Sequence, residues 1–233
     1  MNKTTVKYAF KASLPVMAGY VVLGMGFGIL LSSKGYSVWW ALLMSVFIYA
    51  GSMQYVGVDL LSGGASAIST ALMTLMVNAR HLFYGVSMVG RYRELKGWQK
   101  IYMIFGLSDE TYSLVCADPV LPQEVDWKDY CLLITMMDRC YWIFGTLVGG
   151  LIGNAVSFNS AGIDFSMTAL FVSIVVDQWE QNKQHLPAVL GLLVSLACLL
   201  LFGADQFLIP SMLGISALLL LLRKKIEREG EAL

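Results

Sequence analysis

Ionisable and polar side chains lie inside an otherwise apolar stretch, VNARHLFYGVSM, at residues 77–88. Helical spacing sorts them onto two neighbouring faces, one with Asn78, His81 and Gly85 and the other with Arg80, Tyr84 and Ser87. An arginine near the centre of a bilayer costs at least about 2.5 to 3.5 kcal/mol on insertion scales, so it must face a partner or water. The pattern therefore predicts a polar site inside the protein, where Arg80 faces a partner or water and not the lipid.

Arg80 has one alternative position, near a helix end, from which its side chain would extend toward the basic loop that begins at Arg91. At 1.5 Å per residue, that loop lies about 15 Å away along a helix, which is beyond the comfortable reach of the side chain. We therefore expect Arg80 to face the interior.

Asp109 and Glu110 are the candidate acids to form an ion pair with Arg80. A carboxylate beside a cation in a membrane cavity can change its protonation state when its surroundings change, which is what coupling to protons requires. Another interpretation is structural, with Ser108 capping a helix whose first turn holds both acids. The two interpretations are compatible, and both remain open at this point.

Five further charged residues stand in apolar surroundings: Asp59, Asp138, Arg139, Asp164 and Asp177. Asp138 and Arg139 are adjacent and so point about 100° apart on a helix, which means that they need separate partners. We expect each of the five to lie at a helix end or to tie one helix to another.

The composition indicates that lipid is part of the solvent. Of 233 residues, 57% are hydrophobic and 14% are charged, whereas soluble domains carry about 25% charged residues. A soluble domain of this length has too little interior to bury so much apolar side chain. Sixteen Lys and Arg balance sixteen Asp and Glu, which gives no sign of a nucleic-acid partner. The four cysteines and two histidines form no metal-ligand spacing, so we expect no metal, disulfide framework or cofactor.

Apolar runs of about 20 residues, long enough to cross a bilayer, recur along the chain and predict an all-α integral membrane protein with about seven transmembrane segments, some of them discontinuous. The seven segments are 12–31, 38–61, 65–90, 129–158, 166–179, 187–203 and 207–222. We expect the first to be retained as a span, because no cleavage site follows it. An eighth run, 101–117, carries polar residues in its middle and either spans the bilayer or enters and returns.

Glycine and polar residues interrupt several segments, as in discontinuous transporter helices whose backbone lines a cavity. The interruptions are AGSMQ at 50–54, GGLIGN at 149–154, DQWE at 177–180 and GADQ at 203–206. AGSMQ is the best candidate for a functional break, whereas GADQ fits a turn between two helices.

The charged loops bear on orientation. Residues 91–100 and 223–228 are basic, and the positive-inside rule places both in the cytoplasm. Three full spans before residue 91 would then put the amino terminus outside, despite Lys3, Lys7 and Lys11. Either one early segment does not fully cross, or the rule fails at that end.

A weak internal echo aligns residues 41–54 with 165–178, placing Phe47 opposite Phe171 and Gln54 opposite Gln178. It predicts a single transmembrane transporter domain, 1–233, with two weakly similar repeats, 10–90 and 129–222, linked by 91–128. In transporters with such repeats the substrate binds near the midplane, where the halves meet.

Three ordered motifs carry a family resemblance: FIYAGSMQY at 47–55, VNARHLFYGVS at 77–87 and LSDETYSL at 107–114. Together with LPVMAGYVVLGMGFG at 14–28, they resemble the AzlC or YgaZ-type branched-chain amino acid permeases. The family signatures that they match are AGAAQF, NLRHLLYG and TDE. Ser52 and Met53 replace the usual pair of alanines, and Tyr55 replaces the usual phenylalanine.

The resemblance implies the large subunit of a two-component exporter of leucine, isoleucine and valine in the bacterial cytoplasmic (inner) membrane. It also implies a small membrane partner of the AzlD or YgaH type, and we expect proton antiport. By position, the implied substrate-binding residues are Gly51, Gln54, Asn78, Arg80, His81 and Tyr84, and the proton-coupling residues are Asp109 and Glu110. The residue types agree, since Arg80 suits a carboxylate and an acid suits an ammonium group.

Three other functions compete with this one. An intramembrane hydrolase needs a nucleophile with a base in reach, and neither histidine has such a context, so we expect no enzyme. A passive channel for small neutral solutes predicts flux without saturation. A purely structural membrane subunit leaves the costly charges inside helices unexplained.

Overall fold

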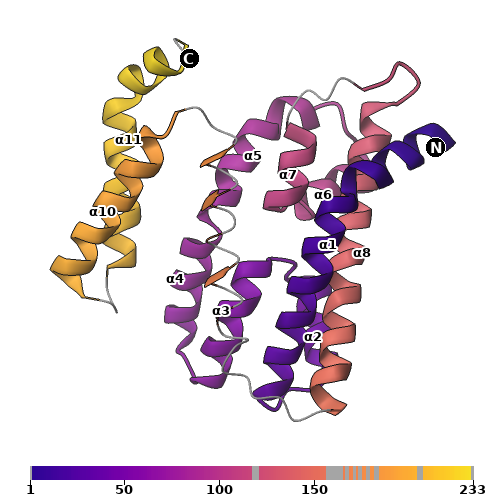
Figure 1. Cartoon of the computed structure of the whole chain (residues 1–233), viewed down its shortest axis with the longest axis horizontal. Coiled ribbons are helices and arrows are strands. Elements are labelled where there is room, and N and C mark those ends of the chain that lie inside the picture. The colour runs from indigo at the N-terminus through magenta and orange to yellow at the C-terminus, as the bar shows by residue number, and fades with distance from the viewer. Residues whose placement is uncertain are drawn as a thin grey trace. The chain divides into compact units, whose positions relative to one another are not determined.

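In the part of the chain that the computed structural model describes, α-helices are joined by short turns and loops, and no strand occurs (Figure 1). The described residues are 2–116, 121–155, 165, 168–169, 172, 175–176, 179–180, 184–203 and 207–231. The chain divides into two compact units, Met1–Met167 and Thr168–Leu233. The expected all-α class is confirmed.

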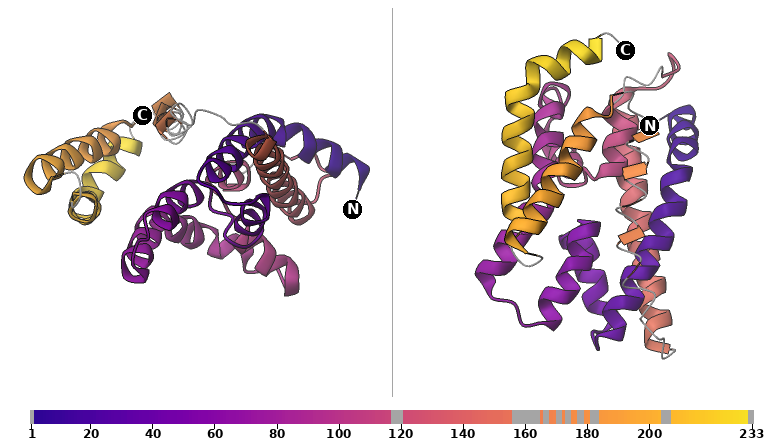
Figure 2. Two further views of the ribbon diagram at one scale, coloured as in Figure 1. Left: turned by 90° about the horizontal axis from the view of Figure 1, so that it is seen from below. Right: turned by 60° about the vertical axis from the view of Figure 1, so that its left-hand side comes forward.

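Two long helices, α1 (Lys3–Ser33) and α8 (Trp127–Ala155), run side by side in the same direction through the first unit (Figure 2). At their beginnings, Asn2 Nδ2 donates to the backbone oxygen of Glu124 at 3.4 Å. Near their ends, Ser32 Oγ donates to the backbone oxygen of Gly150 at 3.2 Å. Each helix is long and apolar enough to cross a membrane.

Glycines bring α1 and α8 to backbone contact. A Cβ atom on Gly24 would lie 2.9 Å from the carbonyl oxygen of Trp142, and one on Gly145 would lie 2.6 Å from that of Val21. The same close approach recurs one turn further along, for Gly28 against Thr146 and for Gly149 against Met25. This is the small-residue packing by which helices associate closely in membranes.

The same packing corrects one prediction from the sequence. GGLIGN at 149–154 was expected to interrupt its segment, but α8 runs through it without a break. A Cβ atom on Gly153 would lie 2.8 Å from the Cβ of Ser32 in α1. These glycines therefore admit a neighbouring helix and do not end their own.

The helices α2 (Val38–Phe47) and α3 (Gly51–Ser62) form a hairpin that starts and finishes at one end of the first unit. Lys34 follows α1, and its Nζ lies 3.9 Å from Oδ1 of Asp59 near the end of α3, so α3 has returned to the level where α1 ends. The tip is residues 48–50, where Tyr49 has a φ of 45°. The break at AGSMQ is thus present, but the expected single span 38–61 is a hairpin.

The helices α4 (Ala67–Val77) and α5 (Ala79–Tyr92) continue one another along the length of the unit (Figure 1). Asn78 separates them, with φ and ψ of −93° and 2°. Its carbonyl oxygen accepts from the backbone nitrogen of His81 at 2.9 Å, a tighter turn than that of an α-helix. The expected continuous helix over 65–90 is therefore broken at Asn78.

The helices α6 (Gly97–Phe105) and α7 (Asp109–Cys116) form a second hairpin, which enters from the opposite end of the unit. Arg91, near the end of α5, donates from Nη1 to the backbone oxygen of Val115, near the end of α7, at 3.1 Å. Its tip, residues 106–108, packs on α8, because Gly106 lies against the Thr135 side chain. Of the two alternatives for 101–117, the segment turns back.

Each hairpin has its own buried apolar cluster. Phe27 and Leu31 of α1 pack with Tyr55 and Val58 around the first hairpin. The cluster around the second hairpin includes Met88, Met103, Val115 and Ile134. The two tips therefore point toward each other from opposite ends, and each is held by a separate core.

The second unit contains α10 (Leu186–Phe202) and α11 (Leu208–Glu231), which pack on each other. They correspond to the expected segments 187–203 and 207–222. Gly203, with a φ of 75°, ends α10, as a breaker would. Phe171, Gln178, Asp164, Asp177 and residues 204–206 lie outside the described residues. The repeats and the single transporter domain therefore stay predictions.

Candidate functional site

The three helix breaks of the first unit meet at Arg80. Its Nη1 lies 2.9 Å from Oδ2 of Asp109, and its Nη2 donates a hydrogen bond to the hydroxyl of Ser52. The three residues lie in the first turns of α5, α7 and α3. Each helix presents its amino-terminal end, with free backbone N–H groups and a partial positive charge. Arg80 faces the interior and pairs with an acid, as the sequence predicted.

Polar atoms without partners remain at this junction. Arg80 Nε, Asp109 Oδ1 and Asn78 Oδ1 are all buried and make no hydrogen bond. Buried polar groups in proteins are nearly always paired, so three such atoms, two on the ion pair and one on Asn78 just before Arg80 in the chain, indicate binding capacity that the chain itself does not use. The set consists of one donor on a cation and two acceptors.

His81 and Tyr84 extend the site along α5. The Nδ1 of His81 lies 3.2 Å from the backbone oxygen of Asn78, which fixes the ring beside the break. Tyr84 stacks on Tyr112 of α7, with ring centroids 4.5 Å apart, and its hydroxyl lies close to the Asp109 carboxylate. The His81 and Tyr84 rings contact each other edge to face.

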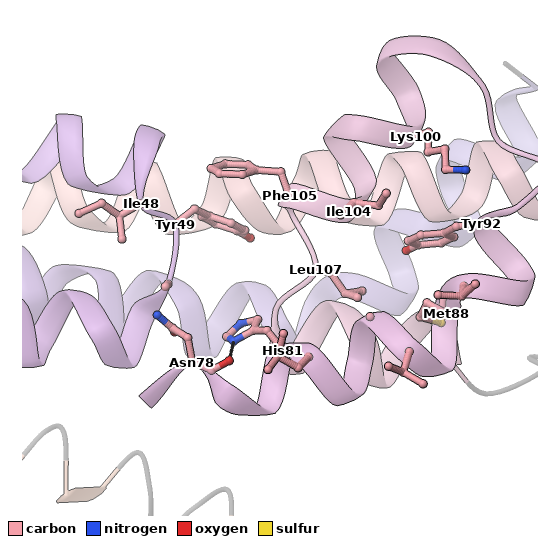
Figure 3. Close-up of a pocket in the computed structure, with 15 residues that line it drawn as sticks. Ile48, Tyr49, Asn78, His81, Met88, Tyr92, Lys100, Ile104, Phe105 and Leu107 are labelled. Atoms are coloured by element: carbon pink, nitrogen blue, oxygen red, sulfur yellow. Dashed lines mark hydrogen bonds between the residues drawn. The ribbon is translucent and has the colours of Figure 1, made fainter. Parts of the chain in front are cut away.

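A cavity of about 690 Å³ is lined by Asn78 and His81, the residues on either side of the Ala79–Arg80 segment in the chain (Figure 3). It lies between the first hairpin's tip, α5 and the second hairpin, and its walls are mostly apolar. Asn78 and His81 lie toward one end, and Tyr92 and Lys100 lie toward the other. Gly85 also lines it, and a Cβ atom there would meet nothing within 4 Å.

Gly51 and Gln54 have different surroundings. Gln54 is fully buried, and its amide donates from Nε2 to Ser45 Oγ at 3.2 Å while Oε1 accepts from Trp142 Nε1 at 2.9 Å. A Cβ atom on Gly51 would lie 3.1 Å from the ring of the same tryptophan. Both residues thus join the first hairpin to α8, and the amide of Gln54 already has a partner at each end.

Glu110 turns away from Asp109 and toward α1. Its Oε2 lies 2.6 Å from the hydroxyl of Tyr20, which also lies 2.6 Å from Ser108 Oγ. Ser108 accepts from the backbone nitrogen of Thr111 at 3.2 Å, so the expected cap of α7 is present. The structural interpretation of the LSDE sequence is therefore confirmed, and the same capped helix start carries the acid that pairs with Arg80, whereas proton coupling by these acids stays a prediction.

Asp138 and Arg139 lie apart, as their adjacent positions required. Arg139 donates from Nη2 to the backbone oxygen of Val46, near the end of α2. Its guanidinium also lies 4.9 to 5.4 Å from three ring centroids, those of Tyr49, Tyr102 and Phe105. Arg139 therefore ties both hairpin tips to α8 and compensates a helix end with positive charge.

Three residues of this region were not among the predicted site residues: Ser52, Tyr20 and Asp138. Ser52 and Tyr20 carried no signal that separates them from other hydroxyl residues in membrane helices. Asp138 did carry a sequence signal, because it is an acid within an apolar run. The sequence did not show that it lies near Glu110.

The comparisons with known proteins agree with this geometry. The sequence model of the family described as "AzlC protein" matches residues 15–156, more than half of the chain. The chain belongs to the AzlC family. It is 43% identical over 220 residues to the branched-chain amino acid transport protein AzlC of Bacillus subtilis (strain 168), covering 94% of this chain and 86% of the relative.

Other AzlC relatives are named as membrane proteins. An uncharacterized membrane protein of Helicobacter pylori (strain ATCC 700392 / 26695) is 39% identical over 95% of this chain and 96% of its own length. Inner membrane protein YgaZ of Escherichia coli (strain K12) is 29% identical over 83% of this chain and 80% of its own. No solved structure matches the chain.

The AzlC membership confirms the expected family and the expected class, an all-α transport protein of the membrane. The matched region contains the Arg80 junction, the cavity and both hairpins. Within the described part of the chain, no group of three or more His, Cys, Asp or Glu side chains is placed to hold a metal ion.

Proposed function

We propose that this AzlC-family chain exports the branched-chain amino acids leucine, isoleucine and valine across the bacterial cytoplasmic membrane, by proton antiport. In this proposal it is the large subunit and works with a small membrane subunit of the AzlD or YgaH type. The name of the Bacillus subtilis relative supports the substrate class. The name of YgaZ supports the inner membrane.

The observation that carries the proposal is the unused polar capacity around the Arg80–Asp109 pair. An amino acid is a zwitterion, so its carboxylate can bind the Arg80 guanidinium, including the unpaired Nε. Its ammonium group can bind the unpaired oxygens of Asp109 and Asn78. Arg80 then exchanges Asp109 for the substrate carboxylate, and Asp109 exchanges Arg80 for the substrate ammonium group. No buried charge is left without a partner of opposite charge.

The cavity beside this junction supports an apolar side chain. Its wall includes the apolar side chains of Ile48, Leu82 and Leu107 as well as Asn78 and His81. A branched side chain placed there leaves water for an apolar surface, which stabilises binding by about 0.8 kcal/mol per buried CH₂ group. The combination of a two-pole polar end and an apolar wall is the general form of a small-molecule site.

Within the proposal, the predicted residues either contact substrate or position other residues that do. Asn78, Arg80, His81 and Asp109 contact substrate. Tyr84 positions Asp109. Gly51 and Gln54 hold the first hairpin against Trp142, so that Ser52 meets Arg80. They therefore act on substrate through the position of the hairpin tip.

The test uses the purified chain in liposomes, with and without the small subunit, loaded with unlabelled leucine and supplied with labelled leucine outside. We expect saturable exchange that isoleucine and valine inhibit. We also expect no inhibition by 4-methylpentanoate, which lacks the ammonium group, or by 3-methylbutylamine, which lacks the carboxylate.

The matched variants are Arg80→Gln and Arg93→Gln, since Arg93 is exposed just beyond α5. Arg80→Gln should abolish exchange and Arg93→Gln should preserve it. Unsaturable flux would instead indicate a passive channel. Inhibition by either one-pole analogue as strong as that by leucine contradicts binding of both poles.

A further inference from the structure

A second pair of acids lies beside the Arg80–Asp109 junction, and substrate binding as proposed above does not use it. Asp138 on α8 is fully buried; its Oδ2 accepts a 2.8 Å hydrogen bond from Thr111 Oγ1, and its Oδ1 has no partner. Glu110 on α7 meets the hydroxyl of Tyr20. Both acids therefore face hydroxyl groups.

Hydroxyl groups connect the two acids without a gap. The Tyr20 hydroxyl lies 2.6 Å from Glu110 and 2.6 Å from Ser108, Ser108 Oγ donates to Thr111 Oγ1 at 3.1 Å, and Thr111 donates to Asp138. The distances are those of ordinary hydrogen bonds between oxygens, except that Ser108–Thr111 is slightly long. A proton can leave one carboxyl and arrive at the other, because each hydroxyl releases one proton and accepts another and is restored.

No cation forms a salt bridge with either acid within the described part of the chain, although the charge of Arg80 acts on Glu110 from a distance. Arg80 is bound to Asp109 and Ser52, and Arg139 is bound to the Val46 carbonyl and three aromatic rings. The other titratable groups that face the two acids are Tyr20 of α1, Tyr49 of the first hairpin tip, Tyr84 of α5, Asp109 of α7 and Tyr130 of α8. Two ionised carboxylates in such surroundings are unfavourable, so at least one holds a proton.

Tyr49 gives an independent sign that this cluster is incomplete. Its hydroxyl is buried without a hydrogen bond of ordinary length, and it interacts with the Tyr20 hydroxyl and with both carboxyl groups. It comes from the tip of the first hairpin, whereas Glu110 comes from the start of α7 and Asp138 from α8. Movement of either hairpin tip would therefore change the surroundings of the acids.

We propose that Glu110 and Asp138 share a transferable proton and form the proton-coupling site of this transporter, separate from the Arg80–Asp109 pair. Asp109 then binds substrate and not the coupling proton. The role in coupling rests on the proposed antiport, whereas the presence of the shared proton does not.

The first test measures the proton directly, by infrared spectroscopy of the purified full-length chain in lipid at neutral pH. We expect a protonated-carboxyl band that shifts in deuterium oxide and loses intensity in Asp138→Asn and in Glu110→Gln. Asp59→Asn is the matched control, because Asp59 is exposed, and it should leave the band unchanged. An unchanged band in both buried-acid variants overturns the shared proton.

The second test separates coupling from substrate binding in liposomes. In Asp138→Asn, leucine flux driven by a pH gradient should fall about 100-fold, whereas leucine exchange at equal pH should stay within about twofold of wild type. Thr111→Val, which removes the connecting hydroxyl, should act in the same direction, and Thr111→Ser should restore the flux. The flux should not depend on sodium at fixed pH.

The outcomes distinguish the two proposals. Leucine exchange in wild type, together with full gradient-driven flux in Asp138→Asn, overturns the coupling site and leaves the substrate proposal standing. Absence of leucine exchange in wild type overturns the substrate proposal, and the infrared experiment still decides whether the acids share a proton. Dependence on sodium in place of the pH gradient overturns the choice of a proton.

Discussion

Arg80 and Asp109 lie in the first turns of two separate helices, α5 and α7, and form an ion pair of 2.9 Å. The ion pair connects α5 to the tip of the second hairpin. Their side chains are 28% and 17% exposed, so the pair is shielded but reachable. A second atom on each, Nε and Oδ1, is buried without a partner. The pair therefore combines a structural contact with unused capacity to bind.

Single and double neutral variants of this pair separate its two roles. Removing one partner of a buried pair costs about 3–5 kcal/mol, and the partial exposure here should reduce the loss of unfolding free energy to about 1–3 kcal/mol. We expect Arg80→Gln and Asp109→Asn each to lower thermal stability in detergent. The double variant should be more stable than either single one, because no lone charge remains, and it should still not exchange leucine. A double variant that exchanges leucine at the wild-type rate contradicts the proposed substrate contacts.

The site was partly predictable from sequence because local chemistry decided part of it. An arginine inside an apolar run needs a partner, because leaving its charge unpaired in the membrane is unfavourable. LSDE offers an acid directly after a helix cap, so the pairing of Arg80 with Asp109 could be predicted. The break at AGSMQ also follows from local composition. The separation of Asp138 from Arg139 follows from helix geometry alone.

The hairpins were not predictable in the same way. A run such as 38–61 has the same length and hydropathy whether its second half continues across a bilayer or turns back, and only contacts such as Lys34 with Asp59 decide between them. Glycine was ambiguous for a similar reason. In GGLIGN it admits a neighbouring helix, and at residue 106 it lies in a turn.

Enlarging Gly85 tests the cavity without disturbing the polar junction. Gly85 lines the cavity, and neither it nor Gly90, on the same helix, has an atom within 4 Å of its Cβ position. We expect Gly85→Leu to fold normally but to raise the KM for leucine more than that for valine, because the added side chain occupies space meant for the longer substrate. Gly90→Leu is the control and should leave both KM values unchanged. Equal KM values in the two variants would show that substrate does not enter this cavity.

Close packing of α1 on α8 makes a different prediction, about stability. A methyl group on Gly149 would overlap the backbone of Met25, and overpacking of this kind typically costs about 1–3 kcal/mol. Gly149→Ala should therefore lower the thermal stability and the yield of folded protein. In Gly19→Ala, where a Cβ atom meets nothing within 4 Å, better helix propensity should raise stability by up to about 1 kcal/mol. Similar melting temperatures for the two variants would show that α1 and α8 are not packed backbone to backbone.

The returning first hairpin resolves the conflict between the charged loops. If α1 and the α4–α5 pair each cross the bilayer and the α2–α3 hairpin does not, the amino terminus and the basic loop 91–100 share one side. Both then obey the positive-inside rule, which three full spans would not allow. The contact between Lys34 and Asp59 places the carboxyl-terminal ends of α1 and α3 together, on the side of the membrane opposite the amino terminus.

Single cysteines and a membrane-impermeant thiol reagent check this arrangement, in a background whose native cysteines Cys116, Cys131, Cys140 and Cys198 are replaced by alanine. Three exposed positions serve: Asn2, Ala65 and Trp98. In inverted vesicles, Asn2→Cys and Trp98→Cys should both react and Ala65→Cys should not; in right-side-out vesicles the pattern should reverse. Reaction of Asn2→Cys and Trp98→Cys from opposite sides would mean that the first hairpin crosses the membrane. Because the tips of both hairpins bring Ser52 and Asp109 to Arg80, that outcome would also remove the structural basis of the proposed substrate site.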